Sequence, residues 1–282
     1  MSRAVEVYLE TNSISDLFRH GSDHEADLRR RLKRAIRERR LRLLTSVWTV
    51  EELTGMARSE PEKYKRAIRF VFDAAGPSVI MPTSDLTAAE LRRGRVLQGT
   101  ERFVARGALA AYKRAALQLD VAAKIGAEVA ERKDASVRAG KAMREAVWQK
   151  LGAVAPDARA AARDWGAARD VWTQTWSRDL LRLEMERLGM DPGLAADYPL
   201  ERVPSIVRFV AFNLSRLARY AGDGRTIERG DDADTQHYTA ASYADLFVTS
   251  DVRLTETCAL IPHGVATSTF EGFAGTYLGL PA

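Results

Sequence analysis

The sequence has little of what marks secreted, membrane or disulfide-bonded proteins. Its 282 residues include a single cysteine, Cys258, which excludes an internal disulfide and fits a reducing compartment. The longest apolar runs fall well short of the roughly 18 residues that a membrane-spanning helix needs. Met1-Ser2-Arg3 leads directly into a predicted strand, and no secretory signal is visible. These absences predict a cytoplasmic protein with no membrane partner.

Motifs of several common enzyme classes are also missing. The chain has no P-loop, no dinucleotide-binding glycine fingerprint and no HExxH metalloprotease motif. Cys258 has no companion typical of a zinc site or a catalytic thiol. What is present is a globular composition, with 46% hydrophobic residues and 43 Lys and Arg against 38 Asp and Glu. This basic excess is compatible with an anionic partner but does not identify one.

Strand and helix signals alternate at both ends of the chain. Three strands are predicted before residue 83, at 4–9, 41–46 and 78–82. The helices predicted between and beside them begin near 11–15 and cover 25–40, 49–59 and 61–75. Towards the other end we predict a buried helix at 203–220, a helix from about 234, and a strand in "DLFVTSD", 245–251. This alternation predicts an α/β fold with a parallel sheet flanked by helices.

The middle of the chain has a different character. It is rich in Ala, Arg, Leu and Glu, has few β-branched runs, and is predicted to be all-helical. Trp165, Trp172 and Trp176 recur there on one helix face, which is typical of a core and less often of a partner surface. We therefore predict a first part of the α/β core at 1–85, a large helical insertion at 86–200, and the rest of the core at 201–282. A helical domain with unrelated flanks is the weaker alternative.

Four carboxylates lie where strands end or helices begin. Glu10 and Asp251 end strands, Glu52 comes early in a helix after a strand, and Asp234 lies in the first turn of a late helix. Ligands of an open parallel sheet bind outside the carboxyl ends of its strands, where helix N-termini also point, so one fold can bring all four together. Clustered carboxylates repel one another unless a cation neutralises them, and oxygen ligands suit Mg²⁺ or Mn²⁺.

Each acid also has an ordinary explanation. Thr49 to Glu52 matches a capping box, in which the glutamate caps its own helix. Asp234 is compatible with a role at a helix N-terminus, Asp251 with a turn, and Glu10 with a solvated loop start. His237, one helical turn after Asp234, either touches the site or packs and hydrogen-bonds elsewhere.

The segments "VYLETNSISDL", "SVWTVEEL" and "DTQHYTAASYADLFVTSD" resemble the signature segments of PIN-domain nucleases, in the same order. The resemblance covers roughly 4–82 and 201–270. It implies metal-dependent hydrolysis of RNA phosphodiester bonds. Carried over residue by residue, it implies the catalytic acids Glu10, Glu52, Asp234 and Asp251. The direct metal ligands would be Glu10, Asp234 and Asp251, and the supporting polar groups would be Asn12, Thr249 and Ser250.

The chain departs from the family pattern in two ways. The first acid of the family is nearly always aspartate, whereas here it is Glu10, which is one methylene longer. The stretch from Glu52 to Asp234 is also far longer than a compact domain of this kind needs, and the helical segment fills it.

A strongly basic helix is the main candidate for nucleic-acid binding. "RRRLKRAIRERRLR", 29–42, holds nine Arg or Lys against one Glu. Leu28, Leu32 and Ile36 form one apolar stripe, so the cations spread over the exposed face. A solvated surface and phosphate binding are about equally compatible with this pattern. The residues we assign to nucleic-acid binding are Arg30, Arg31, Lys33, Arg34 and Arg37.

The resemblance therefore favours a metal-dependent endoribonuclease similar to the toxins of bacterial toxin–antitoxin pairs. The partners that it implies are an RNA substrate, an antitoxin or other regulatory protein, and a second copy of the chain in a homodimer. One alternative is a non-catalytic module of the same fold that binds RNA or a protein. A weaker alternative is a structure-selective DNA nuclease.

Overall fold

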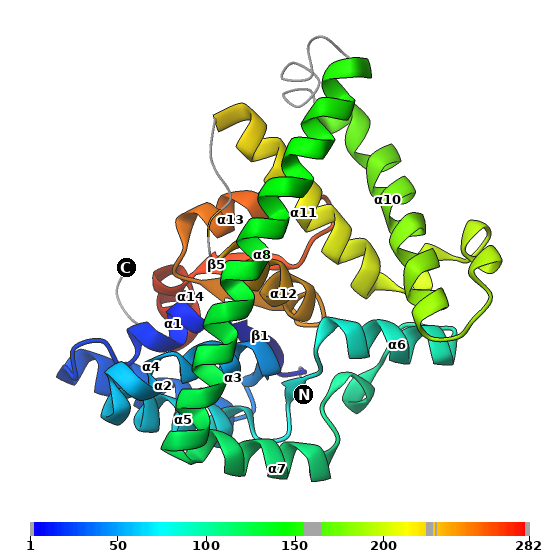
Figure 1. The fold of residues 1–282 in the computed structure, drawn as a ribbon. Coiled ribbons are helices and arrows are strands. Elements are labelled where there is room, and N and C mark those ends of the chain that lie inside the picture. The colour runs from blue at the N-terminus through cyan, green and yellow to red at the C-terminus, as the bar shows by residue number, and fades with distance from the viewer. Residues whose placement is uncertain (1–2, 155–164, 224–227, 229, 280–282) are drawn as a thin grey trace.

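A five-stranded, fully parallel β-sheet forms the centre of the fold (Figure 1). The fold is that of a computed structural model, which describes residues 3–154, 165–223, 228 and 230–279. The strand order is β3-β2-β1-β4-β5. The strands are β1 (Val5–Leu9), β2 (Leu41–Ser46), β3 (Val79–Ile80), β4 (Leu246–Thr249) and β5 (Ala266–Thr269). The prediction of an α/β fold with a parallel sheet flanked by helices is confirmed.

The strand order places a switch point at the middle of the sheet. β1 pairs with β2 on one side, with Tyr8 opposite Leu44, and with β4 on the other, with Leu9 opposite Val248. The chain winds outward from β1 to β3 in one direction and returns to β4 in the other. In such sheets a crevice opens at the carboxyl ends of the two strands where the winding reverses. Glu10 directly follows one of these strands.

Alternate residues of the strands belong to two different hydrophobic cores. Val7 and Leu9 point to one face of the sheet, whereas Tyr8, between them, points to the other. Leu43 and Leu44 of β2 divide in the same way. Buried central strands of this kind read as continuous apolar runs, which explains why they were recognisable in the sequence.

Helices cover both faces of the sheet. Those that line the first core are α1 (Thr11–Asp16), α2 (Asp23–Arg37), α3 (Val47–Thr54), α4 (Met56–Ser59), α5 (Pro61–Ala75), α7 (Arg106–Leu117), the first turn of α8 (Leu119–Val154) and α14 (Phe270–Leu278). Those that line the second are α6 (Thr83–Arg93), α11 (Pro204–Asp223), α12 (Asp231–Ala241) and α13 (Val252–Ala259).

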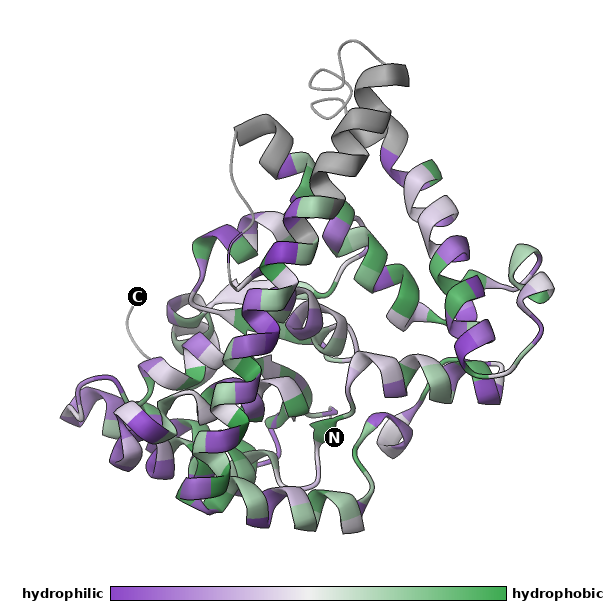
Figure 2. Cartoon of the chain, in the orientation of Figure 1, coloured by the Kyte–Doolittle hydropathy of each residue, from purple (hydrophilic) through white to green (hydrophobic). Residues whose placement is uncertain are grey.

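The chain between β3 and β4 is helical wherever the structure describes it, apart from its turns and connections. α8 (Leu119–Val154) crosses the front of the molecule, and hydrophilic and hydrophobic residues alternate along it (Figures 1 and 2). α10 (Trp165–Arg187) packs with α11 around a third core, which Trp172 and Trp176 border. The side chain of Trp165 lies outside the described residues. The three 3₁₀ turns are Gly99–Arg102, Pro192–Ala196 and Leu200–Arg202.

The structure differs from the local predictions at several places. The helix predicted at 49–59 is broken at Gly55 into α3 and α4. The helix predicted from about 234 begins at Asp231. β5 was not predicted, because its sequence, Ala-Thr-Ser-Thr, carries no apolar run and its side chains are exposed or half-buried. Among the described helices, none is both long enough and apolar enough to cross a membrane.

Candidate metal centre

Glu10 is a buried carboxylate at the switch point of the sheet. Only 3% of the residue is exposed, so the interpretation as a solvated loop start is wrong. Its Oε2 accepts a hydrogen bond from the backbone N–H of Asn12, at 3.0 Å, and caps α1. The Thr249 hydroxyl donates to the same oxygen, at 3.3 Å. Both donors are uncharged, so these contacts orient Glu10 without balancing its charge.

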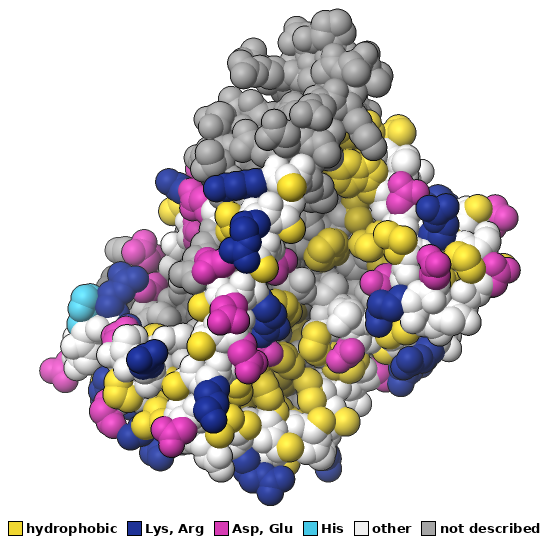
Figure 3. Space-filling model, viewed as in Figure 1, with side chains coloured by type: hydrophobic (Ala, Val, Ile, Leu, Met, Phe, Trp, Pro, Cys, Tyr) yellow, Lys and Arg dark blue, Asp and Glu magenta, His cyan; other side chains and the backbone are white. Residues whose placement is uncertain are grey.

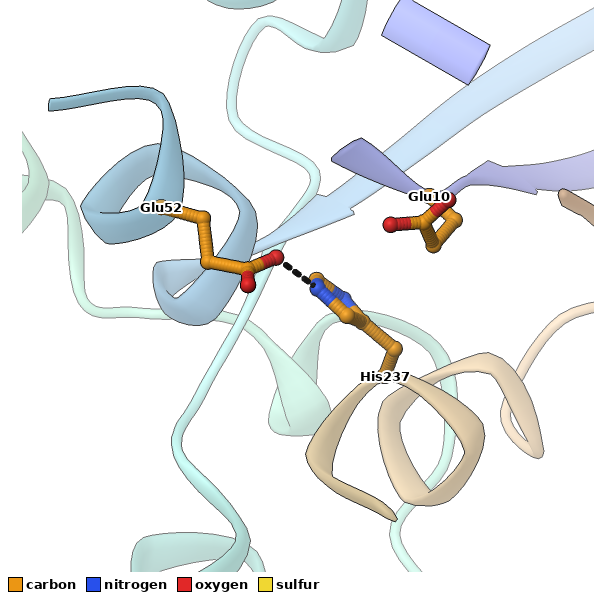
Figure 4. A group of neighbouring side chains, drawn as sticks. All are labelled: Glu10, Glu52 and His237. Atoms are coloured by element: carbon orange, nitrogen blue, oxygen red, sulfur yellow. Dashed lines mark hydrogen bonds and ion pairs between the residues drawn. The ribbon is translucent and has the colours of Figure 1, made fainter. Parts of the chain in front are cut away.

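Glu52 faces the site from α3, and His237 faces it from α12 (Figure 4). His237 Nε2 lies 2.5 Å from Glu52 Oε2, and the Thr11 hydroxyl donates to the same oxygen at 2.6 Å. α3 is capped instead by Ser46, whose hydroxyl accepts from the N–H of Thr49. The capping-box interpretation of Glu52 is therefore wrong, because its carboxylate points to other elements.

His237 links this carboxylate to the second core. Its Nδ1 lies 2.7 Å from the Tyr8 hydroxyl, and the whole side chain is buried. The Tyr8 hydroxyl also contacts Ser46 Oγ at 2.7 Å, which can accept a hydrogen bond from it. Tyr8 can therefore accept from Nδ1–H while Nε2–H donates to Glu52, an arrangement that suits a protonated imidazole. Such a chain fixes the orientation of Glu52.

The charges of Glu52 and His237 stabilise each other. Burial alone would raise the pKa of Glu52, but His237 and Lys133 outweigh it and hold this pKa well below its usual range. Burial alone would lower the pKa of His237, but the Tyr8 oxygen and the Glu52 carboxylate raise it well above 6.5. Lys133, on α8, forms an ion pair with Glu52 Oε1.

Glu10 and Asp234 lack this compensation. Burial is the main cause that raises the pKa of Glu10 to about 7, and Glu52 adds to the rise while His237 opposes it. Burial likewise raises the pKa of Asp234 to about 8, with a further contribution from Glu10. Raised pKa values of this kind mean that ionising either carboxyl in this buried place is costly, even though His237 opposes the rise at both.

Asp251 lies beside this group rather than within it. Together with Asp234 it lines a small cavity of about 80 Å³. Its Oδ1 accepts from the N–H groups of Arg253 and Leu254 and so caps α13. The backbone N–H of Asp251 donates to the Thr249 hydroxyl, at 3.0 Å, which joins it indirectly to Glu10.

The supporting residues predicted from the sequence all lie at this edge. Thr249 contacts Glu10 directly through its hydroxyl. Ser250 contacts the hydroxyl of Ser13 at 3.3 Å. Asn12 contacts Glu10 through its backbone N–H, and the residue itself is exposed. Its contribution is therefore that of a helix N-terminus rather than of an amide side chain.

Several contacts of the site were not predicted from the sequence. The spacing of His237 from Asp234 was the only local signal that pointed to it. Thr11 lies where the first helix was predicted to begin and Tyr8 lies in the strand predicted at 4–9, and neither position carries a signal of a site residue. Lys133 is 81 residues from its partner Glu52, in a segment with no recognisable motif, so no sequence signal could have found it.

The arrangement can hold a metal ion. One ligand atom from each of Glu10, Glu52 and His237 lies within 4.8 Å of the others. Glu10 is buried and its hydrogen-bond donors are uncharged, so a cation here would offset the cost of its charge. The carboxylate oxygens are chemically suited to a divalent ion. Both ring nitrogens of His237 are already engaged, with Tyr8 and with Glu52, so its role here is to orient Glu52.

Two adjoining cavities open beside α8. They measure about 330 and 510 Å³, and Leu180 and Phe209 line both of them. Arg132 lines the first and Lys133 the second. Hydrophobic side chains gather in the hollow between α8 and α10 (Figure 3).

The basic residues predicted to bind nucleic acid lie along another groove. It measures about 730 Å³, and its cations are Arg30, Arg31, Lys33, Arg34, Arg37 and Arg40. A neighbouring groove of about 1010 Å³ shares Arg40 and reaches Val5 and Leu41, where β1 and β2 begin. The combined surface, which we call the basic groove, therefore extends to the amino ends of the strands, opposite Glu10.

Comparison with known proteins gives no match to this chain among protein-family models, curated proteins or solved structures.

Proposed function

We propose that the chain is a PIN-like, metal-dependent endoribonuclease that uses Mg²⁺ or Mn²⁺ at the carboxyl edge of its sheet. The observation that carries the proposal is the buried Glu10, held by uncharged donors and close to Glu52 and His237, with the half-buried Asp234 beside it. Burying a carboxylate charge is costly unless it is paired with a cation. The position at the switch point of a parallel sheet also favours a ligand site.

Glu10 and Asp234 are the proposed direct ligands of the ion, and Asp251 joins them from the adjoining cavity. Glu52 is held by Thr11 and His237, so it is placed to bind the ion or a water beside it. A bound divalent ion supplies a water of lowered pKa and stabilises charge on the phosphate oxygens. Thr249 orients Glu10 from behind.

The proposed substrate is RNA, and the basic groove would contribute non-specific contacts to its phosphates. The same proposal includes three further points: an antitoxin-like or other regulatory protein controls the enzyme, the chain forms a homodimer, and the protein is cytoplasmic.

The experiment that tests this function is cleavage of a mixed RNA pool by the purified protein, with matched single-stranded DNA beside it. Mn²⁺, Mg²⁺ and a chelator are compared. We expect cleavage of RNA that needs the metal and disappears in Glu10→Gln and Asp234→Asn. Cleavage that persists in both variants would locate the activity elsewhere. Preferential cleavage of DNA would replace RNA with DNA as the substrate.

One observation favours a second candidate, a non-catalytic module that binds RNA or a protein. Both carboxylate oxygens of Glu52 are already occupied, one by His237 and Thr11 and the other by Lys133. Glu10 is also longer than the aspartate of the family pattern. Folded protein that binds RNA but cleaves neither RNA nor DNA with any metal would establish this candidate.

A further inference from the structure

α8 delivers a cation to a site whose other residues come from the sheet and its flanking helices. Lys133 Nζ forms an ion pair with Glu52 Oε1. Only 21% of the lysine side chain and 11% of the glutamate side chain are exposed, so solvent screens the pair less than it screens a surface ion pair.

The position of Lys133 is fixed by the way α8 packs on α3. Gly126 lies so close to the end of α3 that a Cβ there would meet the carbonyl oxygen of Thr54 at 2.6 Å. Residue 133 follows seven residues later, about two helical turns on, so it faces the same neighbour. Arg132 adds an ion pair with Glu51 at 2.7 Å, and its guanidinium lies 5.3 Å from the ring centroid of Trp48.

The ammonium group competes with a metal for the same negative charge. It occupies one oxygen of Glu52, while Thr11 and His237 occupy the other. A divalent ion that binds Glu52 must displace or share one of these partners, and it is repelled by a fixed positive charge beside it. Removal of the ammonium charge therefore leaves more negative charge for the ion.

We propose that Lys133 is a resident counter-ion of the metal centre, and that α8 through it sets the affinity of the site for divalent cations. The inference rests on the metal site of the proposed function but not on nuclease activity. It gives the helical segment a defined role, because the segment places a positioning residue that acts on the metal through Glu52.

The test is a Mn²⁺ titration of the full chain, with free Mn²⁺ followed by electron paramagnetic resonance. Lys133→Met and Lys133→Gln both remove the charge, whereas Lys133→Arg keeps it. Lys124→Met removes an exposed lysine of the same helix and is the matched control. We expect the two neutral variants at position 133 to bind Mn²⁺ about tenfold more tightly, which corresponds to ~1.4 kcal/mol. Lys133→Arg and Lys124→Met should stay close to wild type.

Unchanged or weaker Mn²⁺ binding in a folded neutral variant would overturn the inference, and so would the absence of Mn²⁺ binding in all forms. The same titration on Glu10→Gln shows whether the bound ion is at this site. Tighter Mn²⁺ binding by Lys133→Met in a protein that cleaves no RNA would support the inference while rejecting the nuclease proposal.

Discussion

At the scale of single residues, the candidate centre divides its acids into two kinds. Glu52 is neutralised by its neighbours, whereas Glu10 is held only by uncharged donors. A carboxylate in the first situation stabilises the fold through its partners. A carboxylate in the second costs stability, and such a cost is typical of a group retained for function.

This difference predicts the effect of Glu10→Gln. Glutamine keeps the acceptor for Asn12 N–H but removes the buried charge, so the free energy of unfolding in metal-free buffer at pH 8 should rise by about 1–2 kcal/mol. Mn²⁺ binding should be lost at the same time. Urea unfolding and a Mn²⁺ titration measure the two effects. A loss of stability would mean that Glu10 is a structural residue.

Glu10→Asp tests the extra methylene. Aspartate restores the family pattern in a position whose surroundings accommodate a longer side chain. If Glu10 is a tolerated variant of a working site, cleavage of the RNA pool should be preserved or increased in Glu10→Asp. Glu10→Asp shortens the side chain and keeps its charge, whereas Glu10→Gln keeps the length and removes the charge, so comparing the two separates these effects. Loss of activity in both variants would show that the site is built around glutamate.

At the scale of elements, α8 is attached to α3 by close backbone contact as well as by charge. In Gly126→Ala the new Cβ would meet Thr54 O at 2.6 Å and Gly55 N at 3.1 Å, and neither backbone atom can move without moving the helix. We expect a loss of about 1–3 kcal/mol in the free energy of unfolding, although alanine is the better helix former. Gly107→Ala in α7, where no atom lies within 4 Å, is the control and should be neutral or stabilising. Equal effects in urea unfolding would contradict this packing.

The junction of α6 and α11 predicts a pH dependence. Glu90 on α6 accepts from the Ser205 hydroxyl at 2.6 Å and from Tyr243, and burial raises its pKa to about 7. Because this value lies above that of the unfolded chain, the folded state favours the protonated form. The stability of the wild type relative to Glu90→Gln should therefore be greatest at acid pH and fall as pH rises through about 7.

The expected size is a relative loss of roughly 1–3 kcal/mol between pH 5 and pH 8. Chemical unfolding of both proteins across this range measures it. A difference between the wild type and Glu90→Gln that stays constant with pH would show that the carboxyl keeps its ordinary pKa.

The burial of each strand decides whether the sequence could predict it. β1, β2 and β4 were recognisable because strands buried on both faces leave apolar runs, whereas the partly exposed β5 leaves none. Glu10 was recognisable because a carboxylate ends such a run. The contacts of Glu52 could not be recognised in the sequence. His237 lies 185 residues from Glu52 and Lys133 lies 81 residues from it, and only folding brings them together.

At the scale of the whole molecule, the candidate metal centre and the basic groove lie at opposite edges of the sheet. The candidate metal centre follows the carboxyl end of β1, and the basic groove reaches its amino end. The five residues of β1 span roughly 16 Å. An RNA that contacts both edges must therefore be long or folded, and a short oligonucleotide can reach only one of them.

This separation predicts that the basic groove affects long substrates alone. In the double variant Arg34→Gln/Arg37→Gln, KM for a long RNA should rise several-fold with kcat unchanged, because phosphate contacts are lost far from the chemistry. The slope of log affinity against log salt should become shallower by about 1.4–1.8, which is the expected loss for two phosphate contacts. Cleavage of a short oligonucleotide should not change.

Arg92→Gln/Arg182→Gln removes the same charge from exposed positions outside the groove and serves as the control. If the control weakens long-RNA binding equally, the effect belongs to net charge; if the short oligonucleotide is also affected, the groove acts directly at the metal centre.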